Sequence, residues 1–155
     1  LSYATYIDSI KNGVTTVFDH HASFGHITGS LNAIEEAAKD LGVRTCLCYE
    51  ISDRDGMEKS RESVMENVNF IKHALADDSD MIAGMMGMHA SFTISDETMA
   101  LCNELKPEGV GYHIHVAEGI YDLHQCLKEH GKRMLTVFMT GISLDRRLCS
   151  VTVSM

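Results

Sequence analysis

The sequence predicts an α/β fold with a parallel sheet, and two observations lead to this prediction. Nearly continuous apolar segments alternate with single amphipathic helices, which is the pattern of right-handed βαβ units. Polar residues follow each apolar segment at its C-terminal end, where the active sites of (β/α)8 barrels lie. A flavodoxin-like or Rossmann sheet also fits the alternation, but no G-x-G-x-x-G follows any strand, so dinucleotide binding has no support.

The first third of the chain carries the signals of two helices and two strands. Residues 2–11 resemble the end of a helix, and Asn12 and Gly13 after them are typical of a C-terminal cap. The β-branched residues 14–18 predict a strand. Residues 30–40 place their apolar side chains on one helical face before Gly42 ends the helix, and residues 43–51 predict the second strand.

The pattern then repeats twice more. Apolar residues near helical spacing predict a longer helix over residues 56–76, and residues 81–89 form an apolar strand. Ser95 opens the next helix with N-cap chemistry and acidic residues in its first turn, and the only proline ends it. A fourth strand over residues 110–116 and a helix over residues 120–130 complete the series.

Composition restricts the function classes. The 155 residues suffice for one domain, and a formal net charge of −9 disfavours nucleic acid and anionic membranes as partners. No apolar run reaches the about 18 residues of a transmembrane helix, and the first residues lack the basic region of a signal peptide. The five cysteines have no framework spacing, which argues against a secreted disulfide scaffold. We therefore expect a cytoplasmic protein.

The most informative segment runs from Gly111 to Gly119. His113 and His115 would share one face of a strand, and Glu118 would follow just past the strand end. Imidazoles and a carboxylate at the mouth of a parallel strand suit a metal site with an acid/base partner. The alternative is a buried strand with core histidines. Elsewhere, Asp19 and Arg54 are expected to form a loop ion pair.

Three segments resemble the amidohydrolase superfamily. They cover residues 13–21 (GVTTVFDHH), 87–93 (GMHASFT) and 113–118 (HIHVAE), and they are most similar to the branch of triazine hydrolases, guanine deaminases and cytosine deaminase-like enzymes. Residues 49–56 look like a subgroup of aminohydrolases from anaerobic purine-degrading bacteria. The resemblance implies a distorted (β/α)8 barrel beside a small β-sandwich, of which this chain would be a fragment that supplies about strands two to five.

The resemblance also implies roles for individual residues. His115 matches the strand-five histidine that ligates a divalent metal, zinc or iron. Glu118 matches the catalytic glutamate that shuttles protons to the substrate ring nitrogen, and His89 matches a substrate contact from strand four. His21 is the substrate-binding candidate from strand two, although the sequence does not decide between it and His20. The implied reaction hydrolyses a C–N bond of a purine, pyrimidine or triazine by metal-activated water.

Several family features are missing from the chain. The metal site of the family also uses an H-x-H pair on strand one, a histidine on strand six and an aspartate on strand eight, and no residues here match them. The resemblance covers residues 1–133, whereas residues 134–155 do not match, which suggests a shifted reading frame near Arg133. We expect this fragment to be inactive unless partner chains, as in a homo-oligomer, complete the barrel. The alternative is a non-catalytic α/β binding module.

Overall fold

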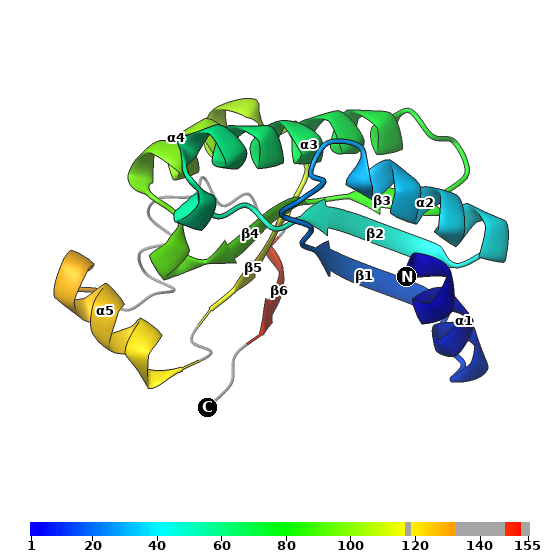
Figure 1. Ribbon diagram of the computed structural model, residues 1–155, viewed down its shortest axis with the longest axis horizontal. Helices are drawn as coiled ribbons and strands as arrows, with labels where there is room; N and C mark the ends of the chain where they lie inside the picture. Colours follow the sequence, from blue (N-terminus) through cyan, green and yellow to red (C-terminus); the bar gives the residue numbers. More distant parts are fainter. Residues whose placement is uncertain (117–118, 133–147, 153–155) are drawn as a thin grey trace.

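The computed structural model describes residues 1–116, 119–132 and 148–152, which form a mixed α/β structure with parallel sheets (Figure 1). The predicted α/β class is confirmed, whereas the numbering of the strands within a barrel stays a prediction. The helices are α1 (Ser2–Lys11), α2 (Ser30–Leu41), α3 (Met57–Leu75), α4 (Asp96–Leu105) and α5 (Ile120–His130). The strands are β1 (Thr16–His21), β2 (Arg44–Tyr49), β3 (Ile82–Gly84), β4 (Met86–Ala90), β5 (Tyr112–His115) and β6 (Leu148–Thr152).

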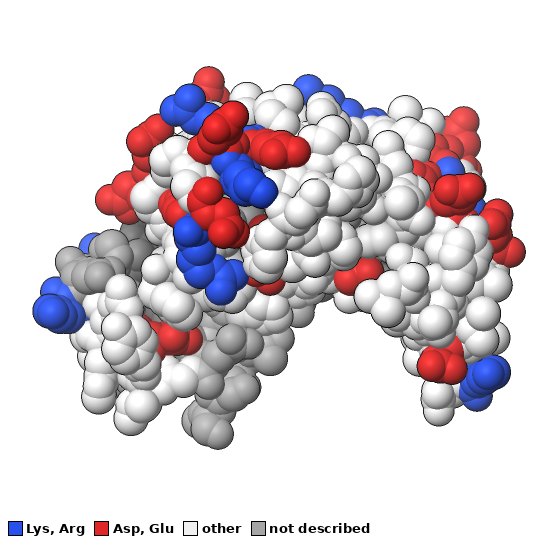
Figure 2. All heavy atoms as spheres, viewed as in Figure 1, with Lys and Arg blue, Asp and Glu red and all other residues white. Residues whose placement is uncertain are grey.

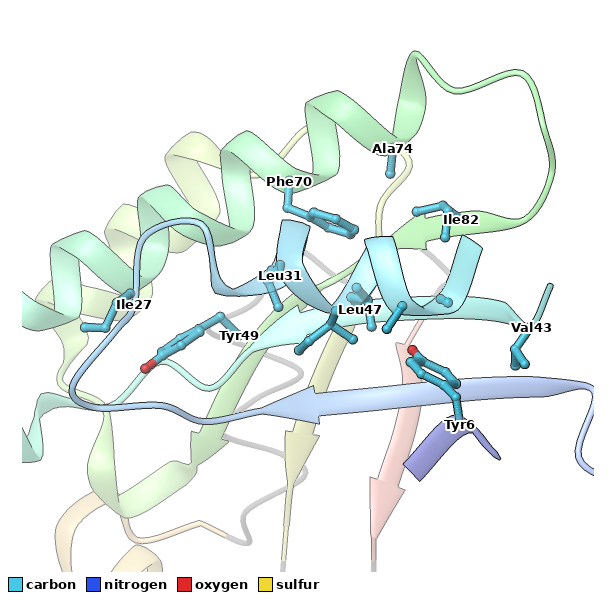
Figure 3. Packing of buried hydrophobic residues seen from close by; sticks show 12 residues of the cluster. Tyr6, Ile27, Leu31, Val43, Leu47, Tyr49, Phe70, Ala74 and Ile82 are labelled. Atoms are coloured by element: carbon cyan, nitrogen blue, oxygen red, sulfur yellow. The ribbon is translucent and has the colours of Figure 1, made fainter. Parts of the chain in front are cut away.

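The strands form two three-stranded sheets, in the orders β1-β2-β3 and β4-β5-β6, and every pairing is parallel. Helices α2, α3 and α4 lie along one side of the strands (Figure 1). Buried apolar side chains fill the space between these helices and the sheets in two clusters. One packs Leu31 and Phe70 against Leu47 (Figure 3), and the other packs Val64 against Ile114. The crossover helices therefore bury one face of each sheet, as is typical of parallel βαβ units.

The side chain of one asparagine links the two sheets where the predicted third strand divides into β3 and β4, beside an isolated parallel bridge between Ile51 and Met88. The side chain of Asn67, on α3, accepts hydrogen bonds from the backbone N–H groups of Tyr49 (2.9 Å) and Gly87 (3.3 Å). Its amide donates to the carbonyls of Tyr49 (2.9 Å) and Ser63 (3.0 Å). A Cβ at Gly87 would lie 2.3 Å from the Tyr49 oxygen, so only glycine permits this close approach. The side chain thus replaces ladder bonds where the strands splay.

The first strand begins and ends later than predicted. The sequence suggests residues 14–18, whereas β1 runs from Thr16 to His21 and pairs along its whole length with β2. His20 and His21 therefore belong to the strand itself, and as neighbours they point to opposite faces. Strand β6 was not predicted, and it pairs in parallel with β5. The predicted change of sequence character at Arg133 lies outside the described residues.

In the view of Figure 2, most Lys, Arg, Asp and Glu side chains lie over the upper and outer parts of the molecule, and few border the hollow on its lower side. Among the described strands, β1 pairs only with β2 and leaves one edge open. Phe18 on this strand is 52% exposed, which is unusual for a large apolar side chain in a sheet. No described helix is both long enough and apolar enough to cross a membrane.

Candidate metal centre

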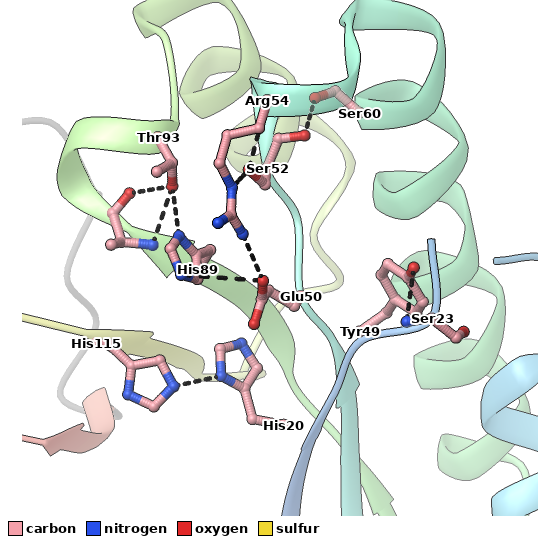
Figure 4. Close-up of polar contacts among 11 residues, drawn as sticks. His20, Ser23, Tyr49, Glu50, Ser52, Arg54, Ser60, His89, Thr93 and His115 are labelled. Atoms are coloured by element: carbon pink, nitrogen blue, oxygen red, sulfur yellow. Dashed lines mark hydrogen bonds and ion pairs between the residues drawn. The ribbon is translucent and has the colours of Figure 1, made fainter. Parts of the chain in front are cut away.

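Three histidines from two strands that are distant in sequence meet at the C-terminal ends of the sheets. One ligand nitrogen from each of His20, His113 and His115 lies within 4.8 Å of the others. The Nδ1 atom of His20 is 2.8 Å from the Nε2 atom of His115 (Figure 4). The ring of His20 stacks on that of His113 with centroids 4.5 Å apart. The alternation of β5 puts His113 and His115 on one face, and the curvature of the structure brings β1 to them.

Two of the three imidazoles, those of His20 and His113, are held in the neutral form. Burial, followed by the nearby His113, His115 and His89, lowers the pKa of His20 to about 3. Burial and the adjacent His115 also lower the pKa of His113. Only a neutral imidazole can donate a lone pair to a metal, so the environment favours the form that a metal site needs.

This neutrality predicts that the metal-free protein loses stability in acid. The pKa of His20 is 6.5 in the unfolded chain and about 3 in the folded one, so below pH 6.5 only the unfolded state gains the proton. Stability is full above pH 6.5 and falls as the pH drops towards 3. The loss between about pH 7.5 and about pH 5 should be about 2 kcal/mol. Urea unfolding with a chelator present measures it, and His20→Gln should remove this part of the dependence. Equal dependence in both proteins would contradict the assignment.

His89 lies beside the cluster at the end of β4, in a network that fixes its ring. Its Nδ1 is 2.9 Å from the Thr93 hydroxyl, which donates its own proton to the carbonyl of Ala90 (2.9 Å). The hydroxyl therefore accepts from His89, so the neutral imidazole carries its proton on Nδ1. The Nε2 atom lies 4.0 Å from a carboxylate oxygen of Glu50, which also accepts a 2.9 Å hydrogen bond from Arg54 (Figure 4).

Glu50 was missed by sequence reasoning, although a signal for it existed. In the β1–β2 register Cys48 lies opposite His20, so the two side chains point the same way. Two residues further along, Glu50 continues on that face and enters the site. In the part of the chain that the structure describes, Arg54 forms its ion pair with this carboxylate and not with Asp19. The predicted ion pair between Asp19 and Arg54 is therefore wrong.

The other predicted site residues have different positions. His21 points to the opposite face from His20, with its Nε2 3.0 Å from the Ser23 hydroxyl and its ring edge-on to Tyr49. Its predicted contact with substrate stays a prediction, and the geometry places His20 beside His115 instead. Glu118 lies outside the described residues. His89 is near the cluster, and its contact with substrate also stays a prediction.

Helix α3 fixes the loop that follows β1. The Glu66 carboxylate accepts hydrogen bonds from the backbone N–H groups of Gly29 (2.9 Å) and Leu31 (3.0 Å), at the start of α2. The Lys59 ammonium donates to the carbonyl of Phe24 (2.6 Å). A buried carboxylate at a helix N-terminus satisfies N–H groups that would otherwise lack partners. Contacts from α3 therefore hold the loop that follows β1 at two places, which limits the movement of the end of β1 and of His20.

The cluster has the chemistry of a transition-metal site. Neutral imidazoles are common zinc ligands, and catalytic zinc sites often have three protein ligands. The Nε2 atom of His20 is buried and has no hydrogen-bond partner in the part of the chain that the structure describes. A buried polar atom without a partner costs about 1–3 kcal/mol, which a bound ion or water would offset. The residues present therefore fit a metal.

Comparisons with known proteins show what the chain is similar to. The model of the Amidohydrolase family matches residues 5–147. A 5-methylthioadenosine/S-adenosylhomocysteine deaminase of Archaeoglobus fulgidus is 26% identical over 128 residues, which cover 82% of this chain and 29% of that protein. A 5'-deoxyadenosine deaminase of Methanococcus maripaludis is 30% identical over 131 residues, with the same coverage. The chain thus spans less than a third of the length of these relatives.

A solved structure shows the same fold. The atrazine chlorohydrolase of Arthrobacter aurescens, complexed with zinc, superimposes with a TM-score of 0.74 over 90% of this chain and 34% of that protein, at 18% sequence identity. The parallel α/β structure described above therefore matches a fragment of an amidohydrolase barrel.

Proposed function

The chain belongs to the amidohydrolase family, and we propose that it supplies part of the barrel of a metal-dependent aminohydrolase. The parent enzyme would hydrolyse a C–N bond that joins an amino group to a nitrogen heterocycle, a purine, pyrimidine or triazine. The observation that carries the proposal is the convergence of His20, His113 and His115 beside His89 at the C-terminal ends of parallel strands. The named deaminase relatives support the reaction class.

In this proposal His115 holds the metal, which is zinc or iron. When bound, the metal lowers the pKa of a water molecule towards neutrality and so supplies a hydroxide nucleophile. The Glu118 carboxyl would protonate the ring nitrogen next to the attacked carbon. The carboxylate would then take the proton of the added hydroxyl and pass it to the exocyclic amino group, which would leave as ammonia. A carboxylic acid suits this step because it can take a proton from the water and return it to the substrate.

The neutral form of His89 would orient the heterocycle. Because Nδ1 donates to Thr93, Nε2 offers a lone pair on the side of the cluster, where it can accept a hydrogen bond from an N–H group of the substrate. Glu50 lies 4.0 Å from that nitrogen and stabilises the imidazolium if the ring takes up a proton. His21 lies on the opposite face of β1 from His20, so it would contact substrate only if the C-terminal end of β1 rotated towards the site.

A chimera tests the proposal. The segment aligned with this chain in the Methanococcus maripaludis 5'-deoxyadenosine deaminase would be replaced by residues 5–132, so that the host supplies the remainder of a barrel. We expect the folded, metal-loaded chimera to release ammonia from at least one aminopurine, aminopyrimidine or aminotriazine. The unmodified host is the control. A folded and metal-loaded chimera that releases ammonia from none of the three classes would refute the proposal.

The second candidate is a non-catalytic α/β binding module, which the open edge of β1 favours. Such a module should be monodisperse by itself, whereas a barrel fragment should self-associate through its uncovered edges. Sedimentation of the purified 155-residue chain distinguishes them. A cytoplasmic location and a homo-oligomer that completes the barrel stay predictions.

A further inference from the structure

We infer that His20, His113 and His115 together form a complete site for one divalent transition-metal ion, so that this chain binds metal without the rest of a barrel. The family resemblance assigns only His115 as a ligand. The spacing within the strand also pairs His113 with it, whereas the addition of His20 depends on the structure. The inference deepens the proposed function and rests on it for the choice of metal. It can nevertheless fail separately, because binding is measured without any reaction.

The distances suit a shared ion. Zinc binds imidazole nitrogens at about 2.0–2.1 Å, so two such nitrogens on a tetrahedral ion lie about 3.4 Å apart. The 2.8 Å separation between the Nδ1 atom of His20 and the Nε2 atom of His115 is shorter than this distance. The upper limit of 4.8 Å on the distances among the three ligand nitrogens is longer. Movements of about 1 Å, within the reach of ordinary side-chain torsions, would equalise the three distances.

Binding would also turn one of the rings. The rings of His20 and His113 are stacked with an interplanar angle of 18°, and stacked rings do not aim their in-plane lone pairs at one point. His115 is already tilted by 46° relative to His20. A rotation of His20 about its side-chain torsions would separate the stack and exchange the hydrogen bond to His115 for two bonds to the ion.

The donor set selects the kind of ion. Within the described part of the chain the group contains three imidazoles and no carboxylate. Such nitrogen ligands suit zinc, iron, nickel and copper, whereas magnesium and calcium prefer oxygen. His113 is only 6% exposed and His20 is partly buried, so few water molecules compete for these nitrogens. The remaining coordination positions would be left to water, as in catalytic sites with three protein ligands.

Titration of the metal-free 155-residue chain with Zn²⁺ and with Co²⁺ tests the inference. We expect one ion per chain by calorimetry and by the visible absorption of bound Co²⁺. His20→Gln and His113→Phe should each weaken metal binding by more than about 100-fold. Loss of a residue that only hydrogen-bonds to a metal ligand already lowers metal affinity by about 10–100-fold, and loss of a ligand should cost more. The phenylalanine keeps an aromatic ring in the stack but offers no lone pair, so packing and ligation are separated.

The matched control is His26→Gln, because His26 is exposed and outside the cluster. It should leave the affinity unchanged, and circular dichroism should show that all variants keep their helices. One ion per two chains, or an unchanged affinity in His20→Gln or His113→Phe, would overturn the inference. Normal binding by the chain together with an inactive chimera would refute the proposed function alone. An active chimera whose zinc affinity is unaffected by His20→Gln would refute this inference alone.

Discussion

Replacing Asn67 with alanine should lower the free energy of unfolding by about 3 kcal/mol or more, because it strands buried backbone groups. The side chain makes four hydrogen bonds, of which three satisfy the backbone of Tyr49 and Gly87 where β2 and β4 diverge. Asn67 is fully buried, so water cannot replace these partners. Urea unfolding followed by circular dichroism measures the loss.

Asn69→Ala is the control for this prediction. Asn69 lies two residues further along α3 but is exposed, and its replacement should change stability by no more than about 0.5 kcal/mol. Asn67→Asp should be nearly as damaging as Asn67→Ala, because the carboxylate cannot donate to the carbonyls of Tyr49 and Ser63. Equal stability of the Asn67 and Asn69 alanine variants would show that the junction between β2 and β4 does not depend on the Asn67 side chain.

Replacing Glu118 with glutamine in the active chimera should lower kcat by about 100-fold to 10,000-fold, the usual contribution of a general acid or base. Glutamine has nearly the same shape but cannot carry a proton between water and the ring nitrogen. The measurement is the rate of ammonia release at saturating substrate. Because Glu118 is not expected to ligate the metal, elemental analysis should show an unchanged metal content.

The matched control is Glu108→Gln, which changes an exposed glutamate in the loop before β5. It removes the same charge and should leave kcat unchanged. If Glu118→Gln retained the full rate with its metal bound, another group would have to move the proton, and the role assigned to Glu118 would be wrong.

Much of the fold follows from the sequence because its local signals are strong. Gly42 sits at φ 69° directly after α2, as a C-terminal glycine cap predicts, and Ser95 caps α4 through the N–H of Thr98. The division of the third predicted strand could not be foreseen in this way. It depends on Asn67, which is 20 residues from Gly87 in sequence, and an asparagine inside a helix gives no local sign that it will bond to a sheet.

The site was predictable within a strand but not between strands. Two-residue spacing correctly places His113 and His115 together, since both join the same cluster. His20 could not be chosen over His21, because the predicted strand stopped at Phe18 and gave no alternation to follow. Once β1 is known to reach His21, the alternation directs His20 inward. The contact between His20 and His115 spans 95 residues and depends on tertiary structure alone.

The most direct test of the account is the metal content of the purified 155-residue chain, measured by mass-spectrometric elemental analysis beside a His115→Ala variant. The account predicts about one zinc or iron per chain in the parent protein and almost none in the variant, because the cluster would lose one of three ligands. An absence of metal from both proteins after growth and purification with added zinc would contradict it. The three histidines would then only pack against one another, and metal binding would require the other strands of a barrel.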